Sequence, residues 1–214
     1  ILITHTHADH ISGLQTLLKR CGAPLFATER AGRELAWRLP DAEARLEVLD
    51  FGAPRSIGDV VVTAVPTSHD APGSCGFRLD TADGAVGVLT DTGYVTDEAA
   101  DALLGVDLAV LEANHDIETL RSGPYPYYLK QRILGPQGHL SNVDAARFAA
   151  ALAESGASEI VLAHLSRENN TPAMAQTAVE QAFSAAGVSP LLSVAPRDCL
   201  GPAHVVCRRS VCKR

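Results

Sequence analysis

The sequence has no long apolar run and no closely paired cysteines. Its apolar stretches fall well short of the roughly 18 consecutive residues of a membrane span, so we expect no transmembrane segment. The five cysteines are odd in number, widely spaced and never in a C-x-x-C pair, which argues against a disulfide framework and against a structural zinc site. A reducing, cytoplasmic location fits this pattern best.

Basic residues are also scarce, since 18 Lys and Arg stand against 25 Asp and Glu and the formal net charge is −7. This balance disfavours broad attraction to polyanions, although net charge says little about the local field of a site. The sequence also has neither a leader-like start nor an initial Met. It begins inside an apolar run, Ile1 to Thr4, which is typical of a strand already in progress, so we expect a fragment that lacks its first strands.

The length and composition are those of one globular domain. The 214 residues can form a single sizeable core, and 46% apolar with 20% charged residues is close to the average for such proteins. We expect one domain over residues 1–196. Residues 197–214 are irregular and become basic, as in a solvated tail, through Arg208, Arg209, Lys213 and Arg214.

Helix-like and strand-like patterns alternate along the chain. The first part predicts helices over 13–21 and 30–39 around a short strand at 24–27. Short β-branched runs at 46–51, 59–65, 75–80 and 85–89 then predict adjacent, largely antiparallel strands. Later segments predict a helix at 96–104, one that ends near Leu134, one from Asn142 as N-cap to Glu154, and one from Thr171 as N-cap with Pro172 at the first helical position. Strands are predicted at 108–112, 159–165 and 191–195.

Four side chains that can bind metal ions fall within six residues, in His5-Thr6-His7-Ala8-Asp9-His10, directly after the first apolar run. A strand that ends in a loop can direct alternate side chains to one point. His5 and His7 can therefore share one ion, while Asp9 and His10 reach a second.

This H-x-H-x-D-H string resembles the signature of the metallo-β-lactamase superfamily. The resemblance implies an α/β fold, an αββα sandwich of two mixed sheets with outer helices and a metal centre at one edge. It also implies a His, an Asp and a His downstream. His69, Asp91 and His164 occur in that order, each at the end of a predicted strand.

Carried over from the family, the first metal is held by His5, His7 and His69, and the second by Asp9, His10 and His164, with Asp91 bridging. Physical chemistry supports this division, because three nitrogens leave an open coordination position and a shared carboxylate keeps two ions close. Imidazole and carboxylate ligands together suit zinc, manganese or iron, so we expect two divalent ions of one of these metals.

The identities of the predicted ligands narrow the choice among the branches of the superfamily. True β-lactamases usually have a Cys where this chain has Asp91, so antibiotic hydrolysis is not expected. Glyoxalase-type thioester hydrolases share all seven ligands. Glu112 at a strand end and His139 in Gly138-His139-Leu140-Ser141 resemble a pair in ribonuclease Z-type enzymes that donates a proton to the leaving oxygen. The candidate catalytic residues are Asp9, Glu112 and His139.

Segment lengths and motifs narrow the choice further. Residues 92–163 are too few for the inserted domain of β-CASP nucleases, and residues 70–90 leave no room for a tRNA-gripping arm. Five strings resemble the YycJ/WalJ group of bacterial metallohydrolases: Thr-Ser-His-Asp-Ala (67–71), Thr-Asp-Thr-Gly (90–93), Glu-Ala-Asn-His-Asp (112–116), Gly-His-Leu-Ser-Asn (138–142) and Leu-Ala-His-Leu-Ser-Arg-Glu-Asn-Asn (162–170). That group implies a 5′–3′ DNA exonuclease, with proposed links to mismatch repair and to cell-wall regulation.

Three function hypotheses therefore stay open: a phosphodiesterase acting on DNA, a small-molecule thioester or lactone hydrolase of the glyoxalase II type, and a metal-binding regulatory protein in cell-wall signalling. Lys130, Arg132 and Arg167 can hold phosphates or lie on a solvated face. Tyr125, Tyr127 and Tyr128 can stack on bases or pack a helix. His115 is a partner of the site or a surface residue, and His204 is expected to be a bystander.

Overall fold

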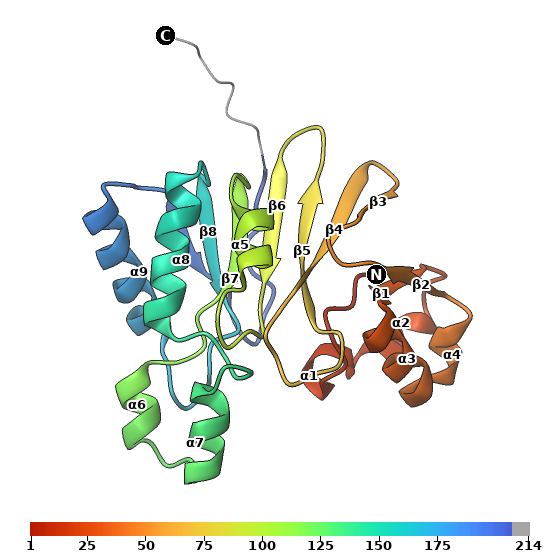
Figure 1. Cartoon of the computed structure of the whole chain (residues 1–214), viewed down its shortest axis with the longest axis horizontal. Coiled ribbons are helices and arrows are strands. Elements are labelled where there is room, and N and C mark those ends of the chain that lie inside the picture. The colour runs from red at the N-terminus through yellow and green to blue at the C-terminus, as the bar shows by residue number, and fades with distance from the viewer. Residues whose placement is uncertain (207–214) are drawn as a thin grey trace.

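The computed structural model describes residues 1–206. Their main element is a seven-stranded sheet with the order β3-β4-β5-β6-β7-β8-β9, seen near its centre in Figure 1. The strands are β3 (Pro54–Ile57), β4 (Val60–Pro66), β5 (Cys75–Asp80), β6 (Ala85–Leu89), β7 (Leu108–Glu112), β8 (Glu159–Ala163) and β9 (Leu191–Val194).

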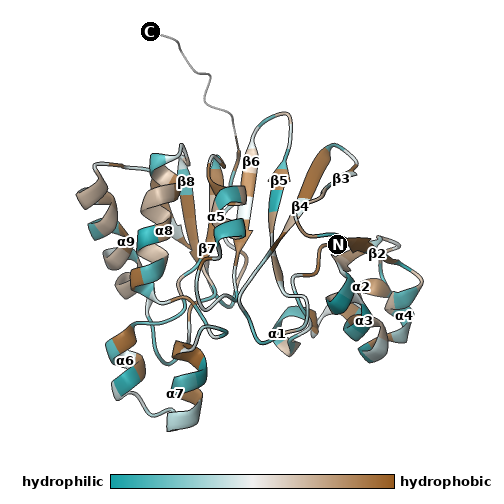
Figure 2. Ribbon diagram, in the orientation of Figure 1, coloured by the Kyte–Doolittle hydropathy of each residue, from teal (hydrophilic) through white to brown (hydrophobic). Residues whose placement is uncertain are grey.

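The sheet is mixed. β3 to β6 run antiparallel to their neighbours, as hairpin connections allow, whereas β6 to β9 are parallel and are joined by helical crossovers. The parallel strands β7 and β8 are rich in buried apolar residues, as expected of strands covered on both faces. Figure 2 shows this apolar character running through β4, β7 and β8.

Three helices cover one face of this sheet: α5 (Asp97–Leu103), α8 (Asn142–Glu154) and α9 (Pro172–Ala186). Thr171 caps α9 and Pro172 occupies its first turn, as predicted for that helix, and Thr96, which was predicted inside its helix, caps α5. The predicted cap of α8 was wrong by one residue. Ser141 accepts the hydrogen bond from Asp144 N, while the buried Asn142 side chain is used elsewhere.

The second layer is a small sheet of two parallel strands, β1 (Leu25–Thr28) and β2 (Leu46–Leu49), with α2 (Leu14–Leu18), α3 (Glu29–Arg38) and α4 (Pro40–Glu43) beside it. Phe26 and Leu49 pack against Val62 and Phe77 of the large sheet. The αββα class is thus confirmed. The neighbours predicted for β2 were wrong, because this strand pairs with β1 instead of joining the antiparallel set.

The predicted strand at residues 1–4 is reduced to a single bridge. Leu2 pairs with Phe26 in parallel, supported by Ile3 N to Phe26 O and Phe26 N to Ile1 O hydrogen bonds. The chain then turns into the short helix α1 (Ala8–Ile11). Residues 5–10 therefore lie at the end of the small sheet that faces the loops of the large one (Figure 1).

Loops that follow β4, β6, β7 and β8 gather at this same end of the large sheet. The short helices α6 (Ile117–Ser122) and α7 (Tyr127–Leu134) project from the β7 to α8 connection beyond the sheet (Figure 1). The carboxyl ends of parallel strands meet at one edge, so this is where the topology brings polar loop residues together.

Residues 197–206 contact the large sheet's end and edge. Arg197 donates to the carbonyls of Leu165 and Ser166, Asp198 pairs with Arg167, and His204 lies 2.6 Å from Glu159. The basic tail residues Arg208, Arg209, Lys213 and Arg214 lie outside the described residues.

No helix within residues 1–206 is long and apolar enough to cross a membrane.

Candidate metal centre

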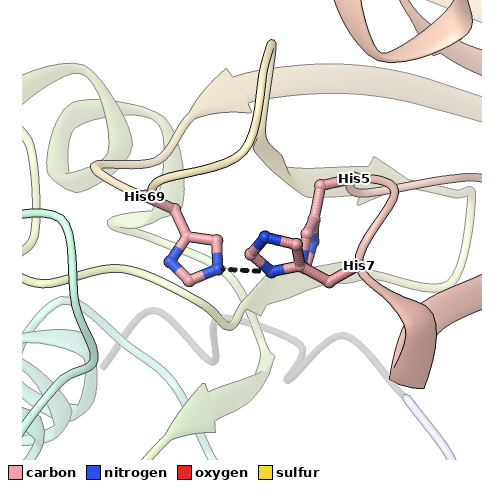
Figure 3. A group of neighbouring side chains, drawn as sticks. All are labelled: His5, His7 and His69. Carbon is pink, nitrogen blue, oxygen red and sulfur yellow. Dashed lines mark hydrogen bonds between the residues drawn. The ribbon is translucent and has the colours of Figure 1, made fainter. Parts of the chain in front are cut away.

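The seven side chains predicted as metal ligands lie close together where the loops of the two sheets meet. His5, His7 and His69 form one group whose ligand atoms lie within 4.8 Å of one another, and Asp9, His10 and His164 form another. In Figure 3 a ring nitrogen of His7 and one of His69 point toward each other, and His5 lies behind His7. These two groups are the same triads that the family resemblance implied.

Asp91 lies between the triads. One carboxylate oxygen is 3.3 Å from His10 Nε2, and the other is 3.4 Å from His164 Nε2 and 3.8 Å from His69 Nε2. The side chain thus reaches members of both groups. A single carboxylate in this position can be shared by two cations.

Most of the imidazoles are oriented by a contact at Nδ1. His5 and His10 contact the hydroxyl of Thr4 at 3.1 and 3.3 Å, and His69 Nδ1 donates to the Gly138 carbonyl at 3.1 Å. The carbonyl acceptor fixes the tautomer of His69, and all three contacts orient the ring so that Nε2 is left to bind a metal ion. Thr4 was not predicted, and its position directly before the His5 motif was the available signal.

The donor set fits a cation. His5 Nε2 and Asp91 Oδ2 are buried without a hydrogen-bond partner in residues 1–206, which is costly for a carboxylate unless a positive charge lies nearby. His7 Nδ1 and His69 Nε2 are 3.1 Å apart, and two nitrogens bound tetrahedrally to one zinc ion lie about 3.3 Å apart. Burial, followed by repulsion from His10, lowers the pKa of His5 to about 3, so this imidazole is neutral and able to ligate.

The backbone is strained at two of these positions. Asp91 has φ 57° and His164 has φ 56°, and they are the non-glycine residues with positive φ in the described part of the chain. The left-handed region is uncommon for such residues and is held only where the surroundings enforce it. Here it turns the chain sharply after β6 and β8, so that both side chains face the centre.

Glu112 ends β7 and is completely buried beneath the centre. Its Oε1 accepts from His139 Nδ1 at 2.8 Å and from His164 Nδ1 at 2.9 Å. Its Oε2 accepts from the backbone N–H groups of Thr92 and Leu140. Burial favours a raised pKa, but the bonds from the two imidazoles outweigh it, so the pKa of Glu112 lies below its usual value and the carboxylate stays charged.

The hydrogen bond to Glu112 also changes the pKa of His139. Burial favours a lowered pKa, but the Glu112 carboxylate outweighs it and holds the pKa of His139 above its usual value. Since Nδ1 of His139 is committed to Glu112, Nε2 is the ring atom left for another partner. His139 also lines the cavity described next.

Two cavities flank the centre. One, of about 380 Å³, is bordered by His7, His69, His139 and His164 and reaches Tyr125 and Arg132; we call it the α7 cavity. The other, of about 730 Å³, is bordered by Asp9, His10 and Arg197. His164, Leu165 and Arg167 line both cavities, so the centre is accessible from two sides.

Some of the other predicted residues lie at the site and others lie away from it. Arg132 and Arg167 lie at the α7 cavity, whereas Lys130 donates to the carbonyl of Arg121. His115 is buried next to the site, with neither ring nitrogen hydrogen-bonded within residues 1–206, so the surface alternative was wrong. His204 lies at the far end of β8, beside Glu159.

Two further residues at the site were not predicted. Asp70 Oδ1 lies 3.6 Å from His7 Nε2, and its Oδ2 accepts from Arg132 Nε at 2.6 Å. Asn114 ties three loops together, since its side chain donates to the His164 carbonyl and its backbone bonds to Leu140 and Ser166. Asp70 follows His69 directly, and Asn114 lies two residues after Glu112 in the Glu-Ala-Asn-His-Asp string; these positions were the available signals.

A family model described as "Beta-lactamase superfamily domain" matches residues 1–165. The chain therefore belongs to this superfamily. The crystal structure of the metallo-β-lactamase fold protein YhfI from Bacillus subtilis has the same fold, with a TM-score of 0.66 and 19% identity over 91% of this chain and 73% of that one.

The motif resemblance to the YycJ/WalJ group is also confirmed. The chain is 38% identical to exodeoxyribonuclease WalJ of Streptococcus pneumoniae over 183 residues, which cover 82% of this chain and 66% of the relative. It is 35% identical to exodeoxyribonuclease YycJ of Bacillus anthracis over 190 residues, 87% of this chain and 71% of the relative. The chain thus spans about two thirds of the length of these relatives.

Proposed function

We propose that this chain is the metal-binding part of a phosphodiesterase that removes nucleotides from the end of a DNA strand. Two divalent ions, zinc or manganese or iron, are held by seven side chains. The first triad is His5, His7 and His69, the second is Asp9, His10 and His164, and Asp91 is shared. Bound ions of this kind supply an activated water and stabilise negative charge on phosphate oxygens.

The observation that carries the phosphodiesterase proposal is the hydrogen bond from His139 to the buried Glu112 beside this donor set. A sugar alkoxide leaves with a high pKa and needs a proton, whereas a thiolate leaves without one. His139 borders the α7 cavity and is held at Nδ1, so Nε2 can deliver a proton to the leaving oxygen. Glu112 orients the imidazole and stabilises its positive charge.

Arg132 and Arg167 bring guanidinium groups to the cavity, and each is paired through one nitrogen with a carboxylate, that of Asp70 or Asp198, which leaves its other nitrogens for a phosphate. Guanidinium groups bind phosphates in two-pronged fashion and position a nucleic-acid backbone without reading its sequence. The names of the WalJ and YycJ relatives support DNA as the substrate and hydrolysis from an end. A cytoplasmic location and a part in DNA repair are consistent with that substrate.

The test has two parts. Metal analysis of the purified chain should find close to two transition-metal ions per molecule, and chelation should lower its thermal stability. End-labelled DNA strands should then be shortened stepwise by the reloaded protein, with the Asp91→Asn variant as the inactive control.

Each alternative function predicts a different result. Faster turnover of a glutathione thioester or a lactone than of DNA would favour a small-molecule hydrolase. Tight metal binding without turnover of either substrate would favour a regulatory metal-binding protein. Absence of bound metal with unchanged stability after chelation would contradict the metal centre itself.

A further inference from the structure

The wall of the α7 cavity that faces the metal centre is partly apolar. Tyr125, Leu129 and Ile133 line it and are half-buried. Leu129 and Ile133 are four residues apart and therefore share one face of α7. Tyr127 and Tyr128 belong to the same segment but are 76% and 74% exposed and do not line the cavity.

Arg132, on the same helix, places a charged guanidinium group at the cavity. Its Nε donates to Asp70 Oδ2 at 2.6 Å, and its two terminal nitrogens make no hydrogen bond within residues 1–206. Asp70 Oδ1 also lies 3.6 Å from His7 Nε2 and 3.7 Å from His69 Nε2. Asp70 thus holds the guanidinium beside the first metal triad, with its outer edge free for an anion.

We propose that the α7 cavity is a subsite for a single nucleotide next to the scissile phosphate. The base lies against Tyr125, Leu129 and Ile133, and the free edge of Arg132 takes a phosphate oxygen. The inference rests on the proposed function and deepens it, because it assigns the part of the substrate that each wall contacts.

The dimensions support one nucleotide unit. A volume of about 380 Å³ is near the lower end of the roughly 300–1,000 Å³ of small-molecule sites. An aromatic and aliphatic wall accepts the face of any base, which gives binding with little sequence preference. The rest of the strand can continue past His164 and Arg167, which border both cavities, toward Arg197.

The base contact is tested with two DNA strands that differ only at the terminal nucleotide, which is intact in one and abasic in the other. Because both keep the same phosphates, the difference in kcat/KM isolates the base. Base stacking implies a loss of about 5- to 150-fold for the abasic strand with the unmodified protein. In Tyr125→Ala most of this difference should disappear, whereas Tyr125→Phe and the exposed control Tyr127→Ala should retain it.

The phosphate contact is tested by salt dependence. Arg132→Met should raise KM for the strand and reduce the slope of log(kcat/KM) against log[salt] by about 0.7, as for one lost phosphate contact on a single strand. Arg121→Met is the matched control. It removes the same charge from α6, where Arg121 pairs with Glu118 at the surface, and should leave the slope unchanged.

The outcomes separate the two proposals. A metal-loaded protein that does not cleave DNA contradicts the proposed function. Cleavage with equal rates on intact and abasic strands overturns the subsite inference alone, and this comparison needs no variant to fold. Equal losses on both strands in Tyr125→Ala, with an unchanged melting temperature, would also overturn it. So would equal effects of Arg132→Met and Arg121→Met on the salt slope.

Discussion

The buried Glu112 accepts a hydrogen bond of 2.8 Å from His139, and the same carboxylate oxygen also accepts from His164 at 2.9 Å. One carboxylate therefore orients two imidazoles that have different proposed roles. His139 faces the α7 cavity, and His164 presents Nε2 to Asp9 and Asp91. Changes at Glu112 and at His139 should consequently have different effects on metal binding.

Glu112→Gln should lower both activity and metal content. The amide lacks the charge that two imidazoles share, and loss of a carboxylate behind a metal-bound His typically weakens metal affinity by about 10- to 100-fold. Metal content after dialysis against a weak chelator would measure this. Glu118→Gln, a surface change on α6, is the control. Full metal retention in Glu112→Gln would show that His164 does not need its partner.

His139→Ala should reduce cleavage of a natural DNA strand by about 10²- to 10⁴-fold, the usual contribution of a positioned proton donor. Metal content should not change. With bis-(p-nitrophenyl) phosphate the loss should be much smaller, because nitrophenolate leaves well without a proton. The ratio of the two losses is the readout. Equal losses on both substrates would mean that His139 positions phosphate or supports its loop instead.

Asp91→Asn should reduce turnover by on the order of 10²- to 10³-fold or more, because the buried carboxylate that offsets two cations is lost. Metal content should fall as well. Inductively coupled plasma analysis and DNA cleavage measure the two effects, and the exposed Asp101→Asn on α5 serves as control. Normal metal content with near-normal rates would contradict the shared role proposed for Asp91.

Much of the candidate centre could be predicted because its residues lie at strand ends. The motif at residues 5–10 and the order His69, Asp91, His164 depend on local pattern and sequence order, and both are visible in the chain. The role of Asn114 was not visible, because its three loop contacts depend on how the segments after β7 and β8 meet.

Strand pairing was less predictable than strand existence. Leu46–Leu49 has the same short apolar pattern as the strands that follow it, yet it pairs with β1 in the other sheet. Pairing depends on long-range packing, here of Leu49 and Phe26 against Phe77, which no local pattern reveals. The same limit applies to the three tyrosines, since tertiary packing of the loop before α7 and of α7 itself decides that Tyr125 lines the cavity while Tyr127 and Tyr128 are exposed.

Gly138→Ala should disturb the site without removing any functional side chain. A Cβ at this position would lie 2.1 Å from the Ile133 carbonyl oxygen at the end of α7, so the loop must shift. That loop carries His139, and its Gly138 carbonyl accepts from His69 Nδ1. Overpacking costs about 1–3 kcal/mol, and each kcal/mol lowers the melting temperature of a chain of this size by about 2–4 °C. We expect that decrease in melting temperature together with at least a tenfold loss of DNA cleavage, since small displacements of catalytic groups are costly.

The control is Gly22→Ala, where a Cβ meets nothing within 4 Å, and it should change neither the melting temperature nor the cleavage rate appreciably. Wild-type cleavage by Gly138→Ala, measured beside Gly22→Ala, would show that the tight approach of this loop to Ile133 is not needed to position His139.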